Sequence, residues 1–174
     1  MTALNPSGDF GEEPITPQSS NYEMGDSGEA VRQLNSLLRG EISAAETYRN
    51  VLDKVRDGDH AQDAGLLRQI QEEHGRAAQS LRDRIRELGG EASDNSGAWG
   101  VWAQAVQGTM SLFGGDMGAL KALKEGEEHG LKDYEEAIDD VDASSAQLMQ
   151  NQLIPAQQRH VNLLDQLLSA PGKA

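Results

Sequence analysis

The residues of this chain that are best suited to chemistry form two sets at one constant offset. Each set contains, in the same order, a glutamate, a tyrosine, a glutamine and a histidine. The first set is Glu41, Tyr48, Gln71 and His74, and the second, 86 positions later throughout (41 to 127, 74 to 160), is Glu127, Tyr134, Gln157 and His160. Carboxylates and imidazoles are oxygen and nitrogen donors that suit iron, manganese or zinc. If the two sets meet in space, the sequence predicts a site for a divalent metal ion.

The apolar residues around these sets keep the same offset. Six matched pairs of leucine, isoleucine or valine accompany the polar residues: Leu34 with Leu120, Leu37 with Leu123, Leu52 with Ile138, Val55 with Val141, Leu67 with Leu153 and Leu81 with Leu167. A coincidence of polar residues alone would not repeat the apolar residues as well. The pattern therefore predicts a duplicated helical hairpin, in which each copy supplies one glutamate and one histidine.

Helical periodicity places the donor residues on the inward faces of four helices. Inward positions advance by steps of three and four residues through Glu41 in the first half and through Glu127 in the second. The helix that follows each of them carries His74 or His160 in the same way. Loops inside the hairpins are short, whereas roughly thirty residues join one hairpin to the other. The sequence predicts an all-α fold, a four-helix bundle of two duplicated hairpins with one long crossover.

We expect two further features in the fourth helix. Ser144 with Gln147 forms a capping-box pattern at its start. Pro155 lies inside the helix, one turn before His160, and removes a backbone hydrogen bond. The helix is expected to kink or bulge there, which would either be a tolerated irregularity or would aim Gln157 and His160.

The chain divides into an arm and a single domain. Residues 1–27 hold three prolines, several acids and few apolar side chains, and they predict a disordered acidic arm. Residues 28–170 form the bundle, and its crossover, residues 89–115, contains a short amphipathic helix. Trp99 and Trp102 in that helix are expected to cover the bundle as a hydrophobic lid or, if exposed, to form a homodimer contact.

Composition narrows the classes of partner. The chain has 174 residues and a formal net charge of −14, which opposes binding to nucleic acid or to anionic membrane lipid. It contains no cysteine, so thiolate zinc sites and iron–sulfur clusters are excluded. No apolar run is long enough to cross a bilayer, and the first residues lack the pattern of a signal peptide. We therefore expect a cytoplasmic protein that binds neither nucleic acid nor membrane.

The donor motifs resemble those of a known group of proteins. Gly40-Glu41 followed by Tyr48 resembles the first-helix motif of rubrerythrins and their bacterioferritin-like relatives in the ferritin-like superfamily. The segment ending at His74 is similar to the Glu-x-x-His segment of that group, and the second half of the chain repeats both motifs. The chain also resembles small ferritin-like bundles of unassigned function. This resemblance implies iron binding, a role in iron handling or oxidative stress, and oxidase- or peroxidase-type activity if iron is bound.

The sequence departs from that group at two positions. Ferritin-like di-iron sites have Glu-x-x-His on both helices, whereas this chain has Gln71 and Gln157 in place of those glutamates. Two carboxylates balance one divalent ion, and a neutral amide bridges two metals poorly. We therefore expect one ion, with iron favoured over manganese or zinc, ligated by the glutamate and histidine pairs: Glu41, His74, Glu127 and His160. Auxiliary or hydrogen-bonding roles fall to the glutamines and tyrosines: Gln71, Gln157, Tyr48 and Tyr134.

An alternative interpretation needs no metal. Glu41 and Glu127 would then pair with protonated histidines in a structural or interaction bundle that retains a degenerate di-iron site. Four glutamates near the motifs are predicted to be solvated because they lie off the inward faces: Glu46, Glu72, Glu73 and Glu128. His129 is expected to be a surface histidine for the same reason.

Overall fold

A computed structural model describes three stretches of the chain, residues 20–55, 61–97 and 116–170. Most of the predicted arm and most of the crossover, including Trp99 and Trp102, lie outside the described residues. The predicted crossover helix and the predicted lid or dimer contact therefore stay predictions.

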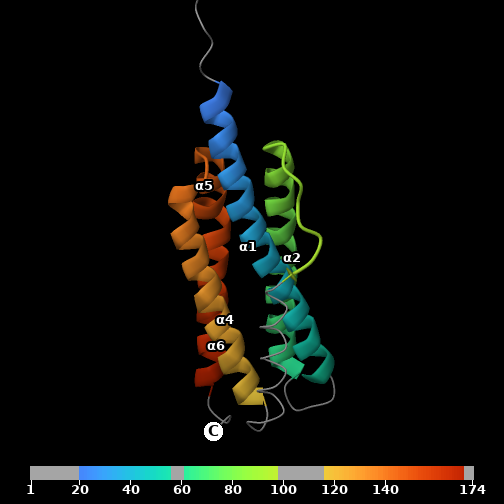
Figure 1. Cartoon of the computed structure of the whole chain (residues 1–174). Helices are drawn as coiled ribbons and strands as arrows, with labels where there is room; N and C mark the ends of the chain where they lie inside the picture. The colour runs from blue at the N-terminus through green and yellow to red at the C-terminus, as the bar shows by residue number, and fades with distance from the viewer. Residues whose placement is uncertain (1–19, 56–60, 98–115, 171–174) are drawn as a thin grey trace, which may run out of the picture.

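The described residues form an all-α four-helix bundle (Figure 1), as predicted. Its elements are α1 (Ser20–Val55), α2 (Ala61–Glu87), α4 (Asp116–Ala137), a 3₁₀ turn (Ile138–Asp140), α5 (Ala143–Leu148), a π-helical turn (Met149–Leu153) and α6 (Ile154–Ser169). The last three run on as one interrupted fourth helix. Helices α1 and α2 form the first hairpin, and α4 with α6 forms the second. No helix in the described part of the chain is both long and apolar enough to cross a membrane.

Helix α1 starts earlier than the sequence suggested. It begins at Ser20, so residues 20–27 are helical rather than part of the arm predicted over residues 1–27. Proline interrupts helices because it lacks a backbone N–H and its ring clashes with the preceding turn. The last proline before α1 is Pro17, and the helix begins three residues after it.

Two apolar clusters occupy the bundle, one on each side of the donor residues. One cluster is centred on Leu34, Leu38, Leu81, Ile85 and Met149. The other is centred on Val51, Ile70, Leu123, Leu164 and Leu167. Along every helix the glutamate or histidine of the predicted site lies between residues of the two clusters. The site is therefore a polar layer between two buried apolar layers, where water screens charges poorly.

The fourth helix carries the irregularity that Pro155 predicted. Directly before this proline, the chain makes a π-helical turn in which the N–H of Ile154 donates to the carbonyl of Met149, five residues back. A wider turn leaves room for the proline ring, which would clash with the preceding turn of a regular α-helix, and tolerates the hydrogen bond that proline cannot donate. Leu153 and Met149 stay buried within the turn, so the core is continuous through it.

The start of this helix differs from the prediction. Asp142, not Ser144, is its N-cap, and its carboxylate accepts hydrogen bonds from the backbone N–H groups of Ser144 and Ser145. The same carboxylate lies 2.6 Å from the guanidinium of Arg84, near the end of α2. An aspartate that serves both a helix N-terminus and an arginine is favoured over a serine at this place.

A tight reversal ends the first hairpin. Gly89 has a φ of +74°, which favours glycine, and a Cβ on Gly90 would lie only 2.6 Å from Cγ1 of Val31. The following residues run back along α1, where the side chain of Asn35 donates to the carbonyl of Glu91 and accepts from the N–H of Ser93. The chain thus leaves the first hairpin pinned to α1.

Candidate metal centre

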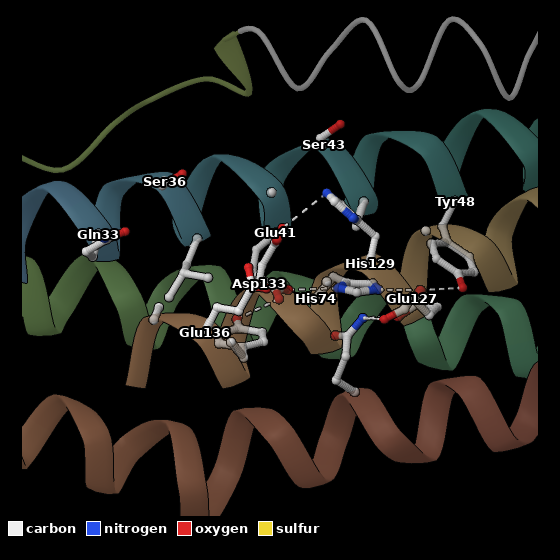
Figure 2. A pocket seen from close by; sticks show the side chains of 18 of the residues that line it. Gln33, Ser36, Glu41, Ser43, Tyr48, His74, Glu127, His129, Asp133 and Glu136 are labelled. Carbon is white, nitrogen blue, oxygen red and sulfur yellow. Dashed lines mark hydrogen bonds and ion pairs between the residues drawn. The ribbon is translucent and has the colours of Figure 1, made fainter. Parts of the chain in front are cut away.

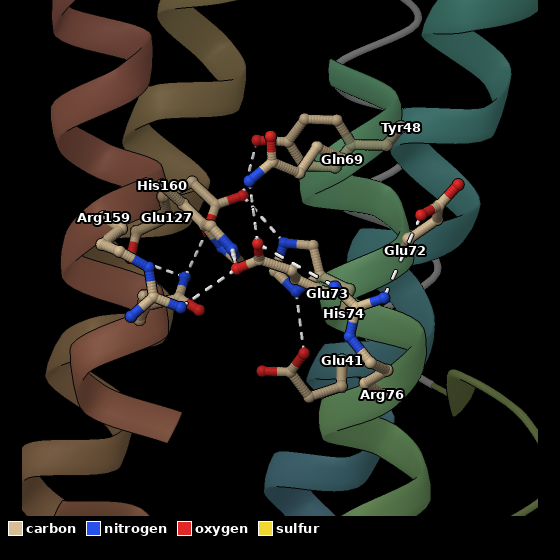
Figure 3. Close-up of polar contacts among 11 residues, drawn as sticks. Glu41, Tyr48, Gln69, Glu72, Glu73, His74, Arg76, Glu127, Arg159 and His160 are labelled. Atoms are coloured by element: carbon tan, nitrogen blue, oxygen red, sulfur yellow. Dashed lines mark hydrogen bonds and ion pairs between the residues drawn. The ribbon is translucent and has the colours of Figure 1, made fainter. Parts of the chain in front are cut away.

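Each of the four helices contributes one predicted ligand to the polar layer. Glu41 comes from α1, His74 from α2, Glu127 from α4 and His160 from α6 (Figure 3). All four are buried, with between 2% and 6% of each residue exposed. The structure therefore brings together the four predicted ligands.

His74 lies between the two glutamates of the site. Its Nδ1 is 2.7 Å from Oε2 of Glu41, and its Nε2 is 3.0 Å from Oε1 of Glu127. Burial by itself lowers the pKa of this imidazole, but the charges of Glu127 and Glu41 outweigh burial and raise the pKa to about 10. In the metal-free protein His74 is thus an imidazolium that donates to both carboxylates.

Glu127 receives more hydrogen bonds than any other described residue of the site. Its Oε1 also accepts a 2.6 Å bond from the hydroxyl of Tyr48. Its Oε2 lies 3.2 Å from Nδ1 of His160 and accepts from the side-chain amide of Gln157. Burial raises the pKa of the Glu127 carboxyl, yet the neighbouring His74 and His160 hold it well below its usual range. Glu127 is therefore a buried, charged carboxylate to which most of the other polar side chains of the layer bind.

The tyrosines connect the two hairpins. Tyr134 donates to Oε1 of Glu41 over 2.7 Å, while Tyr48 donates to Glu127, so each tyrosine reaches the glutamate of the other hairpin. Burial, together with the adjacent carboxylates, raises the pKa of both phenols well above the ordinary value. Both remain neutral hydrogen-bond donors that orient the glutamates.

The two glutamines lie in different environments. Gln157 is buried, and its amide also donates over 3.0 Å to the main-chain carbonyl of Glu127. Gln71 is only partly buried, and among the described residues no hydrogen bond partner is found for its amide. Of the two glutamines, only Gln157 forms a hydrogen bond to a candidate ligand among the described residues.

Glu73 lies at the site, contrary to the prediction from the sequence. It was expected to be solvated, but its side chain is only 15% exposed and its Oε2 lies 3.0 Å from Nε2 of His160 (Figure 3). Burial raises the pKa of this carboxyl, but hydrogen bonds from Gln69, His160 and Arg159 lower it overall. Arg159, which is 3.2 Å away, stands 86 positions after Glu73. Glu73 and Arg159 are thus equivalent positions of the repeat and carry opposite charges. This pairing of charges was the sequence signal for the contact. The other three glutamates lie at or near the surface as expected, although Glu46 is partly buried.

The donor set fits a metal ion. His74, Glu127 and His160 each offer a ligand atom, and these atoms all lie within 4.8 Å of one another. The two imidazole rings are 4.8 Å apart between centroids. Two imidazoles and a carboxylate, buried together, are compatible with binding of a divalent ion. Glu41 adjoins this group through His74.

A pocket of about 320 Å³ opens beside the site, between α1 and α4 (Figure 2). Its floor includes Glu41, His74 and Glu127, and the two tyrosines also line it. His160 does not line the pocket. The layer is thus accessible from the α1–α4 face.

Comparison with known proteins identifies the domain. Neither a curated protein nor a solved structure gives a significant match to the chain. A family of ferritin-like helical domains does match, over α1, α2 and α4 but not over the helix that carries Gln157 and His160. Because the match covers residues 29–140, more than half of the 174, the chain belongs to the family described as Domain of unknown function (DUF2383).

Proposed function

We propose that the bundle binds one divalent metal ion in its polar layer, with His74, Glu127 and His160 as ligands and Glu41 as a fourth. The observation that supports this most directly is the group of two imidazoles and a carboxylate whose donor atoms lie within 4.8 Å of one another. Such a group is costly to bury in an apolar bundle unless a cation compensates its charge.

Charge balance favours a single ion. Glu41 and Glu127 together carry two negative charges, which a divalent cation neutralises once the proton on His74 is displaced. A second ion would add two positive charges to a layer that has low dielectric. The residues that replace bridging glutamates offer no compensation, because Gln157 is neutral and already donates to Glu127, and Gln71 is turned partly to the surface.

Iron is the favoured ion, with manganese and zinc as alternatives that suit the same donors. The resemblance to rubrerythrins and bacterioferritin-like proteins supports iron, and with it oxidase- or peroxidase-type activity in iron or oxidative-stress handling. Bound iron would supply the redox chemistry. The protein would contribute the neutral phenols of Tyr48 and Tyr134, which hold the two glutamates in place.

Metal analysis of matched variants tests the proposal. Protein is loaded anaerobically with Fe(II), desalted and subjected to elemental analysis, beside Glu127→Gln/His160→Gln and the control Glu128→Gln/His129→Gln. The control changes the same residue types on the exposed side of α4. We expect about one ion per chain in the wild type and the control, and a loss of bound iron in the site variant. Wild-type protein that retains no iron, manganese or zinc would refute the proposal.

One observation favours a second candidate, a metal-free structural bundle. Every buried side-chain nitrogen and oxygen among the described residues has a hydrogen-bond partner without any ion, and His74 already serves as the cation between Glu41 and Glu127. The two candidates differ in thermal stability. A bound ion at about 100 times its Kd adds roughly 2.7 kcal/mol to the free energy of unfolding, whereas a chelator leaves a metal-free bundle unchanged.

A further inference from the structure

Among the described residues, the pocket between α1 and α4 gives the candidate metal centre an open side. Its floor contains Glu41 and Glu127, the two carboxylates of the site (Figure 2). On the opposite face, between α2 and α6, the ion pair of Glu73 and Arg159 covers His160 (Figure 3). An ion that approaches the layer therefore meets a pocket on one face and a side-chain pair on the other.

Gly40 leaves space in this pocket that packing against the described residues does not require. It lies in the middle of α1, where glycine is less favourable than alanine by about 1 kcal/mol. A Cβ on Gly40 would meet no atom of the described residues within 4 Å. At Gly90, by contrast, a Cβ would lie 2.6 Å from Val31, so the backbone there needs glycine for close packing. The missing side chain at position 40 enlarges the pocket instead.

The charge around the pocket selects for cations. Its wall includes Asp133 and Glu136 of α4 and Asp140 of the 3₁₀ turn that follows α4. His129 is the one basic side chain among the described residues of its outer lining. With a net charge of −14 on the whole chain, this wall raises the local concentration of cations and repels anions.

We infer that this pocket is the route by which the divalent cation reaches the buried carboxylates, and that Gly40 keeps the route open. The inference rests on the proposed function. The acidic wall formed by α4 and the 3₁₀ turn after it draws the hydrated ion in, and the ion then passes Gly40 to reach Glu41 and Glu127. The route predicts an effect on rates rather than on affinity, because Gly40 is not a ligand.

Stopped-flow mixing with Co(II), followed by its visible absorbance, tests the route. The variants are Gly40→Leu and the control Gly65→Leu. Gly65 lies on the exposed side of α2, where a Cβ would likewise meet no described atom within 4 Å. We expect Gly40→Leu to bind and release Co(II) about tenfold or more slowly, because the leucine must move aside for the ion to pass. Its Kd and final absorbance should equal those of the wild type, and Gly65→Leu should match the wild type throughout.

The outcomes separate the route from the site. Wild type that binds no Co(II) refutes the proposed function, whereas wild-type rates in Gly40→Leu refute the route alone. Equal slowing in Gly65→Leu also refutes it. If circular dichroism shows that Gly40→Leu does not fold, Glu136→Gln/Asp140→Asn decides: the route requires slower association and a weaker dependence of that rate on salt. An unchanged rate and salt dependence would overturn it.

Discussion

The two hairpins repeat one design but hold their histidines differently. In each, the histidine lies 33 residues after the glutamate, and its Nδ1 faces that glutamate's Oε2. The distance is 2.7 Å for His74 with Glu41 and 3.2 Å for His160 with Glu127. The second nitrogen of His74 crosses to Glu127, whereas that of His160 turns to Glu73, near the surface. Both imidazoles therefore bridge the hairpins, but only His74 joins the two glutamates of the candidate site.

The glutamines extend this difference. Gln157 fastens Glu127 from the second hairpin, while Gln71 fastens nothing in the described first hairpin. A duplication therefore repeats the residue types of a site without repeating their energetic roles. The ion pair of Glu127 and His74 lies at the centre of the layer, and the other residues of the layer form hydrogen bonds around it. Four changes would break or sharpen this comparison.

Removal of each imidazole should have the largest effect and an unequal one. In metal-free protein, His74→Leu leaves Glu41 and Glu127 buried without the cation between them, at a cost of about 3–5 kcal/mol. His160→Leu should cost only about 1–3 kcal/mol, because Glu127 keeps His74, Tyr48 and Gln157. Urea denaturation in the presence of a chelator measures both. Equal losses would contradict the unequal roles of the two histidines.

The stability of the metal-free protein should fall with alkaline pH through His74. The folded protein holds this proton up to a pKa of about 10, whereas the unfolded chain releases it near 6.5. The stabilisation is complete below pH 6.5 and is lost as the pH rises toward 10, with a slope of about 1.4 kcal/mol per pH unit. The lowered pKa of Glu127 acts only in acid, where protonation removes its contribution. Urea titrations at several pH values should lose this slope in His74→Gln, and a flat wild-type profile would rule the interpretation out.

Truncation of the two glutamines should also reduce the free energy of unfolding unequally, by smaller amounts than removal of the histidines. Gln157→Ala removes two hydrogen bonds to Glu127 and is expected to cost about 1–3 kcal/mol. Gln71→Ala should stay within about 0.5 kcal/mol of the wild type. Thermal unfolding of the metal-free proteins compares them. A larger loss in Gln71→Ala would mean that the first hairpin depends on its glutamine after all.

The smallest effect concerns Gly130 and its counterpart in the repeat, Ala44. A Cβ at Gly130 would lie 3.0 Å from the amide nitrogen of Gln157. Gly130→Ala should therefore gain helix stability but disturb Gln157, with a net change within about 0.5 kcal/mol. In a Gln157→Ala background the same change should stabilise by about 0.5–1 kcal/mol, and Ala44→Gly should destabilise by a similar amount. If a double-mutant cycle shows no coupling between positions 130 and 157, the amide of Gln157 is not the reason for glycine at position 130.

The bundle and the convergence of its four polar helices were predictable because both depend on periodicity and on a repeated core. Glu41 and His74 lie on inward faces by helical geometry alone. The role of Glu73 was not predicted. This residue does lie off the inward face of α2, as helical geometry indicates, but the periodicity of one helix does not show that residues of another helix bind its carboxylate. Only the second hairpin brings His160 and Arg159 close enough to hold its carboxylate.

The glutamines show a second limit of sequence reasoning. Gln71 and Gln157 are equivalent in the repeat, so the same role was predicted for both. Pro155 and the π-helical turn before it distinguish the fourth helix from α2, and Gly130 makes room for the amide of Gln157 where the first hairpin has Ala44. Local backbone and side-chain volume decide which glutamine faces the site.

The contact between Glu73 and Arg159 also favours the pairing of unlike hairpins. These two positions are equivalent in the repeat and touch each other, so they lie near the approximate twofold axis of the bundle. Two copies of the first hairpin would place glutamate against glutamate at that point, and two copies of the second would place arginine against arginine. Only unlike hairpins bring opposite charges together. The ion pair thus favours the association of the first hairpin with the second, which forms the complete polar layer, over assemblies of two identical hairpins.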